Sequence, residues 1–346
     1  MHTALLKEIE LQQSFFTDKT TIHTLYFGGG TPSLLKPSDI QSLIEKIGHH
    51  FNIAEDAEVT LEANPDDLTS DYLHALKETT SINRLSIGIQ SFHDKDLQYM
   101  KRAHSAEEAK NAILLAQQAG FDNLSVDLIY GTPGLSNEAW KENLKTLFNL
   151  NIPHISAYAL TIEEKTELAI LVAKQKVPSP DDEQMAQQFA ILLEETRKHN
   201  YVQYEISNFC KEPHFAKHNT NYWKGVPYLG FGPSAHSFDG NIRYWNISNN
   251  GQYLKSIREN KIANEHELLD IKDQYNEYVM TSIRTIWGID KTTISNRFGE
   301  ESLNYFLLEI SPFISNRWVK EEKDIFTLTD SGKLFCDYIT EHLFIE

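Results

Sequence analysis

Cysteine is scarce in this sequence. Only Cys210 and Cys336 occur among 346 residues, far apart and in neither a CxxC nor a CxxxCxxC arrangement. Two isolated thiols exclude a disulfide-stabilised scaffold and any cysteine-rich metal site built from these residues alone.

Long apolar runs and an excess of basic residues are also lacking. No stretch reaches the roughly 18 apolar residues that a transmembrane helix needs. Residues 1–10 have the pattern of an amphipathic helix rather than of a cationic signal peptide, so we expect a cytoplasmic protein. The formal net charge of −17 opposes unspecific binding to nucleic acid or anionic lipid.

Short apolar runs alternate with helical patterns over residues 1–207. They occur at 24–27, 58–61, 84–89 and 124–126, at steps of roughly 30 residues. This spacing is typical of strand–helix–strand units, whose parallel strands point their carboxyl ends at one shared mouth. The sequence therefore predicts an α/β fold with a partial TIM-type (βα) barrel.

Polar residues follow these runs, where the barrel mouth should open. The first run leads into the loop Gly28-Gly29-Gly30-Thr31, whose backbone amides can approach a ligand closely. Glu62 and Asp127 offer carboxylates, Gln90 an amide and Arg102 a bidentate guanidinium. Such a set suits a zwitterionic ligand that carries a ribose. Taken singly, the loop is also compatible with a ligand-free turn, the carboxylates with helix caps or ion pairs, and Arg102 with a solvated helix position.

The pattern changes beyond residue 207. Residues 208–260 are rich in aromatic residues and glycine and are expected to form a packed loop region that connects two domains. Residues 261–346 show two helices, a two-strand hairpin and a last helix, which predicts a small winged-helix-like domain. Acidic residues outnumber basic ones there, so a packing or lid role is favoured over DNA binding.

Several strings in a fixed order give the sequence a family resemblance. They are Tyr26–Ser33 (YFGGGTPS), Leu61–Pro65 (LEANP), Arg84–Phe92 (RLSIGIQSF), Lys101–His104 (KRAH) and Val126–Gly134 (VDLIYGTPG). The chain resembles the oxygen-independent coproporphyrinogen III oxidase family of the radical S-adenosylmethionine (SAM) superfamily. This resemblance covers essentially the whole chain, including the C-terminal domain.

The resemblance implies a SAM site in the barrel. It implies Arg102 at the methionine carboxylate, and the acidic residues at the ammonium group or the ribose. The residues that would bind SAM are Gly29, Gly30, Thr31, Glu62, Gln90, Arg102 and Asp127.

The sequence departs from this family at one place. Members hold a 4Fe-4S cluster through CxxxCxxC after the first strand, and this sequence shows neither that motif nor that strand. Without those thiolates the electron source for radical formation is missing. We therefore assign no catalytic residue, and expect that upstream DNA encodes a strand followed by CxxxCxxC.

Within the family, the chain resembles the haem chaperone branch through the string His218–Trp223 (HNTNYW), an HNxxYW signature of that branch. The resemblance implies haem as ligand, with His218 as the candidate axial ligand of the iron. Tyr222 and Trp223 offer flat apolar surface to the porphyrin. His236 is expected to be structural, and His214 gives no signal.

The sequence thus favours a haem-binding chaperone that also binds SAM and passes haem to an acceptor protein, which the sequence does not identify. Two alternatives remain at this stage. One is an oxidase that decarboxylates coproporphyrinogen III. The other is a cluster-free protein that uses the barrel to hold a nucleoside-like ligand.

Overall fold

The computed structural model describes residues 1–17 and 20–346. These form two compact units, each assembled from separate parts of the chain. The first unit comprises Met1–Thr24, Ser38–Ala57 and Lys217–Glu346, and the second comprises Leu25–Pro37 and Glu58–Ala216. Strands β1 and β2 cross the boundary between the two, at residues 24 and 57.

The second unit contains most of a seven-stranded sheet with the order β1-β2-β3-β4-β5-β7-β6. Strands β2 to β5 pair in parallel, whereas β7 pairs antiparallel with both β5 and β6. The strands are β1 Thr21–Phe27, β2 Asn52–Ala63, β3 Arg84–Gln90, β4 Leu124–Tyr130, β5 His154–Ala159, β6 Val202–Glu205 and β7 Asn208–Cys210.

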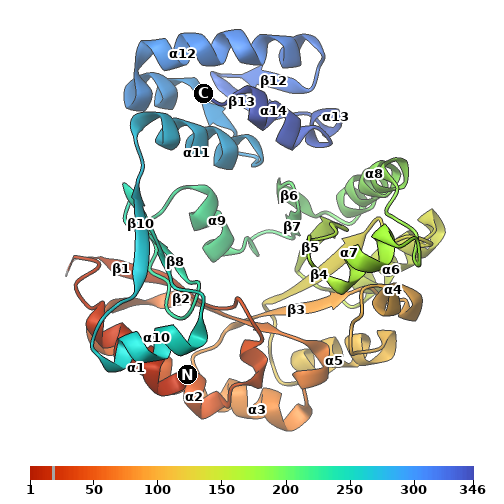
Figure 1. Cartoon of the computed structure of the whole chain (residues 1–346). Helices are drawn as coiled ribbons and strands as arrows, with labels where there is room; N and C mark the ends of the chain where they lie inside the picture. The colour runs from red at the N-terminus through yellow and green to blue at the C-terminus, as the bar shows by residue number, and fades with distance from the viewer. Residues whose placement is uncertain (18–19) are drawn as a thin grey trace. The chain divides into compact units, whose positions relative to one another are not determined.

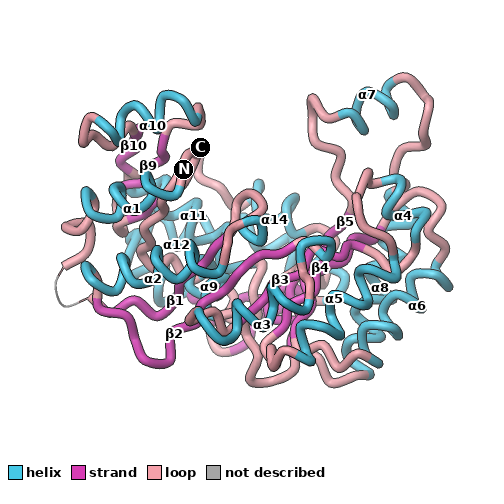
Figure 2. The backbone as a smooth tube through the Cα atoms, turned by 90° about the horizontal axis from the view of Figure 1, so that it is seen from below, coloured by secondary structure: helices cyan, strands magenta, loops and turns pink. Residues whose placement is uncertain are grey.

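Helices connect the parallel strands. In Figure 2 the helices α3, α5, α6 and α8 lie in a row along the strands. The helices of this unit are α3 Ser70–Thr79, α4 Asp94–Tyr99, α5 Ala106–Gln118, α6 Asn137–Asn149, α7 Glu167–Ala173 and α8 Asp182–Lys198, with short 3-10 turns at η1 Pro32–Leu34 and η2 Pro65–Asp67.

Apolar strand residues form the core of this unit. Leu61, Ile87, Val126 and Ile155, one from each parallel strand, are fully buried. Burial on both faces explains why these strands read as near-continuous apolar runs in the sequence. The predicted partial (βα) barrel is confirmed, since the curled sheet is open and its carboxyl ends face one mouth.

The first unit contains α1 His2–Leu11 and most of α2 Pro37–His50, together with everything that follows residue 216. The prediction of packed loops over residues 208–260 is wrong in part, because the region also forms helices and two strands of a small sheet of order β10-β9-β8. The elements are α9 Lys217–Trp223, β8 His236–Phe238, β9 Ile242–Asn246, α10 Asn250–Arg258 and β10 Asn264–Leu268.

The C-terminal region matches the predicted helix, helix, wing and last helix, in blue in Figure 1. A third strand, too short to show in the sequence, completes its sheet in the order β11-β13-β12. The elements are α11 Ile271–Ile283, β11 Ile289–Asp290, α12 Lys291–Ser315, β12 Val319–Glu322, β13 Ile325–Leu328, α13 Asp330–Lys333 and α14 Cys336–His342.

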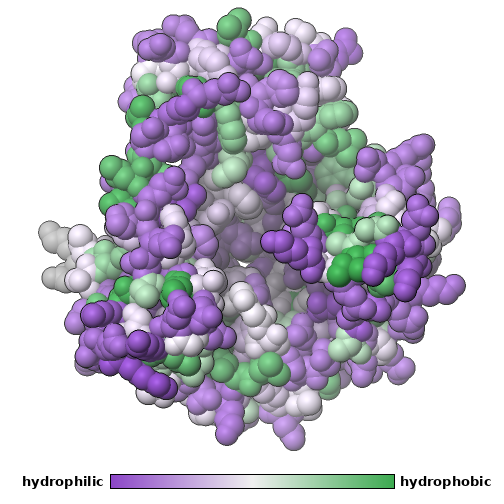
Figure 3. Space-filling model, viewed as in Figure 1, coloured by the Kyte–Doolittle hydropathy of each residue, from purple (hydrophilic) through white to green (hydrophobic). Residues whose placement is uncertain are grey.

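One helix of the second unit is apolar in sequence but lies at the surface. Helix α7 has the sequence ELAILVA and buries none of its residues, and Figure 3 shows apolar side chains at the surface over it. None of the described helices is long and apolar enough to span a membrane.

A buried carboxylate anchors α1 within the first unit. Glu8 is fully buried and accepts hydrogen bonds from the Gly232 N–H (2.8 Å), Asn246 Nδ2 (2.6 Å) and the Tyr253 hydroxyl (2.6 Å). Burial raises the pKa of Glu8 despite these donors. The carboxylate thus ties the first helix to residues of the chain's second half.

We expect Glu8→Ala to destabilise the protein strongly. It leaves three buried donors without an acceptor, at a cost of about 1–3 kcal/mol each. Urea unfolding followed by fluorescence should show a loss of at least about 3 kcal/mol. The matched control is Glu10→Ala on the same helix. Its ion pairs with Lys7 and Lys46 are partly exposed to solvent, so this variant should change stability little. Equal midpoints for both variants would contradict the anchoring role.

Candidate functional site

The mouth of the barrel brings most of the predicted SAM residues together. Thr31, Glu62, Gln90, Arg102 and Asp127 line one cavity of about 180 Å³. The remaining lining residues are Gly30, Pro32, Ser33, Ala63, Asn64, Ser86 and Gly88. Five loops or strands far apart in the sequence thus converge because the strands are parallel.

The glycine loop is organised around Glu62. The Tyr26 hydroxyl donates to Glu62 Oε1 (2.6 Å), and the Gly29 N–H donates to Glu62 Oε2 (3.2 Å). Gly28 permits this approach, because a Cβ there would lie 2.6 Å from the Tyr26 ring and 2.8 Å from the Glu62 carboxylate. Gly29 does not line the cavity, and its φ of 79° turns its amide toward Glu62.

Sequence reasoning missed Tyr26. The charge of Glu62 adds to burial in raising the pKa of the Tyr26 hydroxyl, which therefore remains a hydrogen-bond donor. Its only sequence signal is its position in the strand directly before the glycine loop.

Gln90 and Arg102 meet at a break in the sheet. Gln90 ends β3 with φ 65°, and the register with β4 shifts between Ile87 and Gln90. Arg102 Nη2 donates to Asn64 Oδ1 (3.0 Å) and to the Gly88 carbonyl (3.1 Å). A bulge with a left-handed non-glycine residue is a form of strain that clusters at functional sites.

Gly88 and Asn64 are the residues that position this pair. A Cβ at Gly88 would lie 3.0 Å from Gln90 Nε2, a tight contact, and 3.6 Å from Arg102 Nη2, an ordinary one, so glycine leaves the Gln90 amide more room beside the arginine. Asn64 lies inside the LEANP string, but nothing local in the sequence pairs it with Arg102. The Arg102 side chain does not point to solvent from a helix, since α4 ends at Tyr99.

Asp127 differs from the other residues in its position along its strand. It sits in the middle of β4 and not at its end, because the strand continues to Tyr130. Burial, with a smaller contribution from Glu62, raises its pKa to about 6, against an opposing hydrogen bond from Ser156. A cationic or hydroxyl-bearing ligand next to this carboxylate would stabilise its charged form, which accepts hydrogen bonds.

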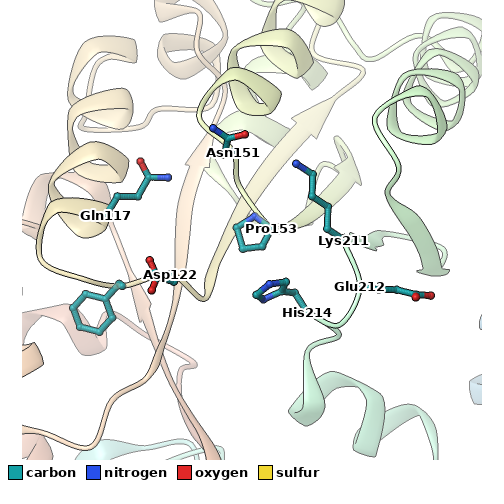
Figure 4. Close-up of a pocket in the computed structure, with 8 residues that line it drawn as sticks. Gln117, Asp122, Asn151, Pro153, Lys211, Glu212 and His214 are labelled. Carbon is teal, nitrogen blue, oxygen red and sulfur yellow. The ribbon is translucent and has the colours of Figure 1, made fainter.

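The opposite end of the strands carries a larger pocket, about 470 Å³ (Figure 4). It lies where the chain enters β4 and β5 and leaves β7, and Figure 4 shows Glu212 turned away from the other labelled side chains. His214 lines it, but none of the predicted SAM residues does. Its lining residues are Gln117, Phe121, Asp122, Asn151, Pro153, Lys211, Glu212 and His214.

The predicted haem residues lie on one short helix of the first unit. His218 and Tyr222 are four residues apart on α9 and therefore share a face, with Trp223 beside them. His218 Nδ1 lies 3.2 Å from Thr24 Oγ1 and so has a fixed ring orientation. Tyr222 is 45% exposed, and its ring meets Trp223 edge-on with centroids 5.2 Å apart.

Other candidate ligands are not gathered in this way. His236 is exposed on β8, 6.4 Å from the Trp245 ring between centroids. Cys210 and Cys336 are buried in different units. Among residues 1–17 and 20–346 no group of three or more His, Cys, Asp or Glu side chains is placed to hold a metal ion.

Two family patterns match different parts of the chain. The pattern of the radical SAM superfamily matches residues 5–147, and that of the HemN C-terminal domain matches residues 269–335. The latter confirms the resemblance predicted for the tail.

Curated relatives match nearly the whole chain. The haem chaperone HemW of Mycobacterium tuberculosis is 35% identical over 98% of this chain and 85% of its own length. HemW of Bacillus subtilis is 31% identical over 92% of this chain and 84% of its own length.

A solved structure shares the fold. The coproporphyrinogen III oxidase HemN of Escherichia coli, described as a radical SAM enzyme, aligns with a TM-score of 0.82 at 23% identity. The alignment covers 99% of this chain and 82% of HemN. Together with the curated relatives, these matches show that the chain belongs to the HemW-type family of the radical SAM superfamily.

Proposed function

We propose that this protein is a haem chaperone that binds haem on α9 and delivers it to an acceptor protein. The relatives that match it over most of their length are named haem chaperones. The observation that carries the proposal is the placement of His218, Tyr222 and Trp223 on one partly exposed helix.

In this proposal His218 supplies the axial nitrogen and the aromatic residues support the porphyrin. A hydrogen-bonded Nδ1 fixes the tautomer and orientation of the ring, which is the usual arrangement when Nε2 binds a metal. Thr24 Oγ1 is placed for that role. Tyr222 adds ring surface, about half of which is open to solvent, so a ligand held there can be passed on.

We also propose that the barrel mouth binds SAM. The residues fit the ligand, because the cavity combines carboxylates, an amide and a guanidinium with a glycine-lined wall. Arg102 would pair with the methionine carboxylate, and Asp127 would accept from ribose hydroxyls or the ammonium group. Glu62 would stabilise the glycine loop through Gly29 and Tyr26.

A 4Fe-4S cluster does not fit the residues of this sequence. Its two cysteines are buried in different units, so they cannot form the cysteine site that the family uses. The functions proposed for this protein are therefore the binding of haem and of SAM.

Titration with ferric haem tests the chaperone proposal. A saturable Soret band, followed by its loss from this protein on addition of an apo-acceptor such as apomyoglobin, supports binding with release. Haem that produces only the spectrum of free haem would contradict the proposal. Turnover of coproporphyrinogen without haem binding would favour an oxidase instead.

The raised pKa of Asp127 predicts a pH dependence of SAM binding. The carboxylate accepts hydrogen bonds only when deprotonated, so affinity should rise between about pH 5 and pH 7 and level off above, around its pKa of about 6. Calorimetry should show this rise in wild type but not in Asp127→Asn, whose affinity should stay near that of wild type at the acidic end of the range. The matched control, Asp122→Asn in the pocket of Figure 4, should keep the wild-type profile. The same rise in Asp127→Asn would show that another group titrates.

A further inference from the structure

The end of α9 packs against the segment that follows α11 through two cation–aromatic pairs. The Arg284 guanidinium carbon lies 4.5 Å from the centroid of the Trp223 ring. Lys224 Nζ lies 4.4 Å from the centroid of the Trp287 ring. We refer to Trp223, Lys224, Arg284 and Trp287 as the cationic rim of α9.

The cationic rim is unusual in so acidic a protein. The chain has 49 acidic and 32 basic residues, yet residues 213–238 and 278–289 contain no Asp or Glu. These are the two segments that meet at the rim.

Two acidic residues near these segments have cationic partners outside the rim. Asp56, which faces the start of α9, pairs with Lys217 (3.1 Å), and Glu277 pairs with Arg243 (2.7 Å). Asp290 caps the following helix α12 through its side chain. The Asp and Glu residues nearest to the rim in sequence thus lie outside the two segments, whose own charged side chains are basic.

Packing on indole rings also orders the two cations. An Arg or Lys side chain held over an aromatic face loses less rotamer freedom when it binds an anion than a free surface side chain does. The Lys224 side chain is exposed at the surface, and Arg284 is only partly buried. Both cations thus remain accessible while their side chains are supported.

Haem matches this arrangement, because it is a flat apolar ring with two propionate carboxylates along one edge. We propose that Arg284 and Lys224 bind the two propionates of the haem whose iron is bound by His218. This inference rests on the proposed haem function and adds the two side chains that bind the propionate edge of the haem. The guanidinium would bind one carboxylate through two parallel hydrogen bonds, and the ammonium would bind the other as a point charge.

The test compares ferric haem with its dimethyl ester, in which both propionates are neutral. Wild type should bind haem at least roughly tenfold more tightly than the ester. Arg284→Gln and Lys224→Gln should each reduce this preference, and the double variant should abolish it. The Soret maximum should stay at the wild-type wavelength, because the iron ligand is unchanged.

Two controls separate charge from packing. Arg297→Gln removes an arginine that packs on Tyr278 (5.6 Å) and Phe298 (4.9 Å) in the same unit, and it should keep the wild-type preference. Arg284→Lys keeps the charge over Trp223 and should restore part of the preference lost in Arg284→Gln.

The outcomes distinguish this inference from the function on which it rests. Equal affinity of wild type for haem and ester, or a double variant that still prefers haem, would overturn the role of the rim while leaving haem binding intact. Absence of a Soret band with both ligands would instead overturn the proposed function.

Discussion

His218→Ala should abolish the Soret band of the haem complex or shift it strongly. The substitution removes the proposed iron–nitrogen bond but leaves α9 otherwise unchanged, since alanine favours a helix. We expect haem affinity to fall by roughly 100-fold, equivalent to about 3 kcal/mol. Absorbance titration measures both effects, and circular dichroism checks the fold.

Two further variants separate the loss of the iron ligand from other effects on haem binding. Trp223→Ala should weaken binding less, because it removes an apolar contact and leaves the iron ligand in place. His236→Ala is the matched control, an exposed histidine on β8 of the same unit, and should bind haem like wild type. An unchanged titration for His218→Ala would reject it as the ligand and direct attention to His214 or Cys210.

Arg102→Ala should have the largest effect on SAM binding. Arg102 is positioned by Asn64 and by the Gly88 carbonyl at the cavity wall, so its remaining donors have a defined direction. Removing it leaves the ligand carboxylate unpaired, at a cost of roughly 1–3 kcal/mol, or about 5- to 150-fold in affinity. Calorimetry with SAM measures this directly.

The neighbouring residue supplies the control. Lys101 is exposed, and its nearest acidic partner, Glu167, lies 3.8 Å away at the surface, so Lys101→Ala should bind SAM like wild type. Arg102→Lys should recover little, because an ammonium cannot reproduce the two parallel hydrogen bonds of a guanidinium. If Arg102→Ala and Lys101→Ala bind SAM equally well, the carboxylate is bound elsewhere.

The sequence predicts those parts of the fold that depend on local patterns. Ser105 and Glu108 form the capping box that their spacing predicts. Ser179 followed by Pro180 also has the sequence pattern of an N-cap, but Asp181 caps α8 instead, and its side chain accepts from the Gln184 N–H. Where two residues of similar N-cap preference lie close together, the sequence predicts the start of a helix only to within a few residues.

Site residues could be found in the sequence where a strand ends, but not where a contact is made across the fold. Glu62 and Gln90 could be predicted because each stands at the end of an apolar run, and both line the cavity at the mouth of the barrel. Tyr26 and Asn64 acquire their importance only from partners on other strands. The contact of Trp223 with Arg284 joins two distant segments, and neither segment shows a local pattern that would predict it.

The carboxylate of Glu8 also has a consequence for biosynthesis. Its partners Gly232 and Tyr253 follow it by 224 and 245 residues, so they leave the ribosome long after α1 does. At about 5–20 residues per second, α1 would wait roughly 10–50 s for the last of them. The second unit ends at Ala216 and can be complete by then. During translation, the Glu8 carboxylate therefore lacks these two partners until most of the chain has been made, although α1 can meet α2 much earlier through Glu10 and Lys46.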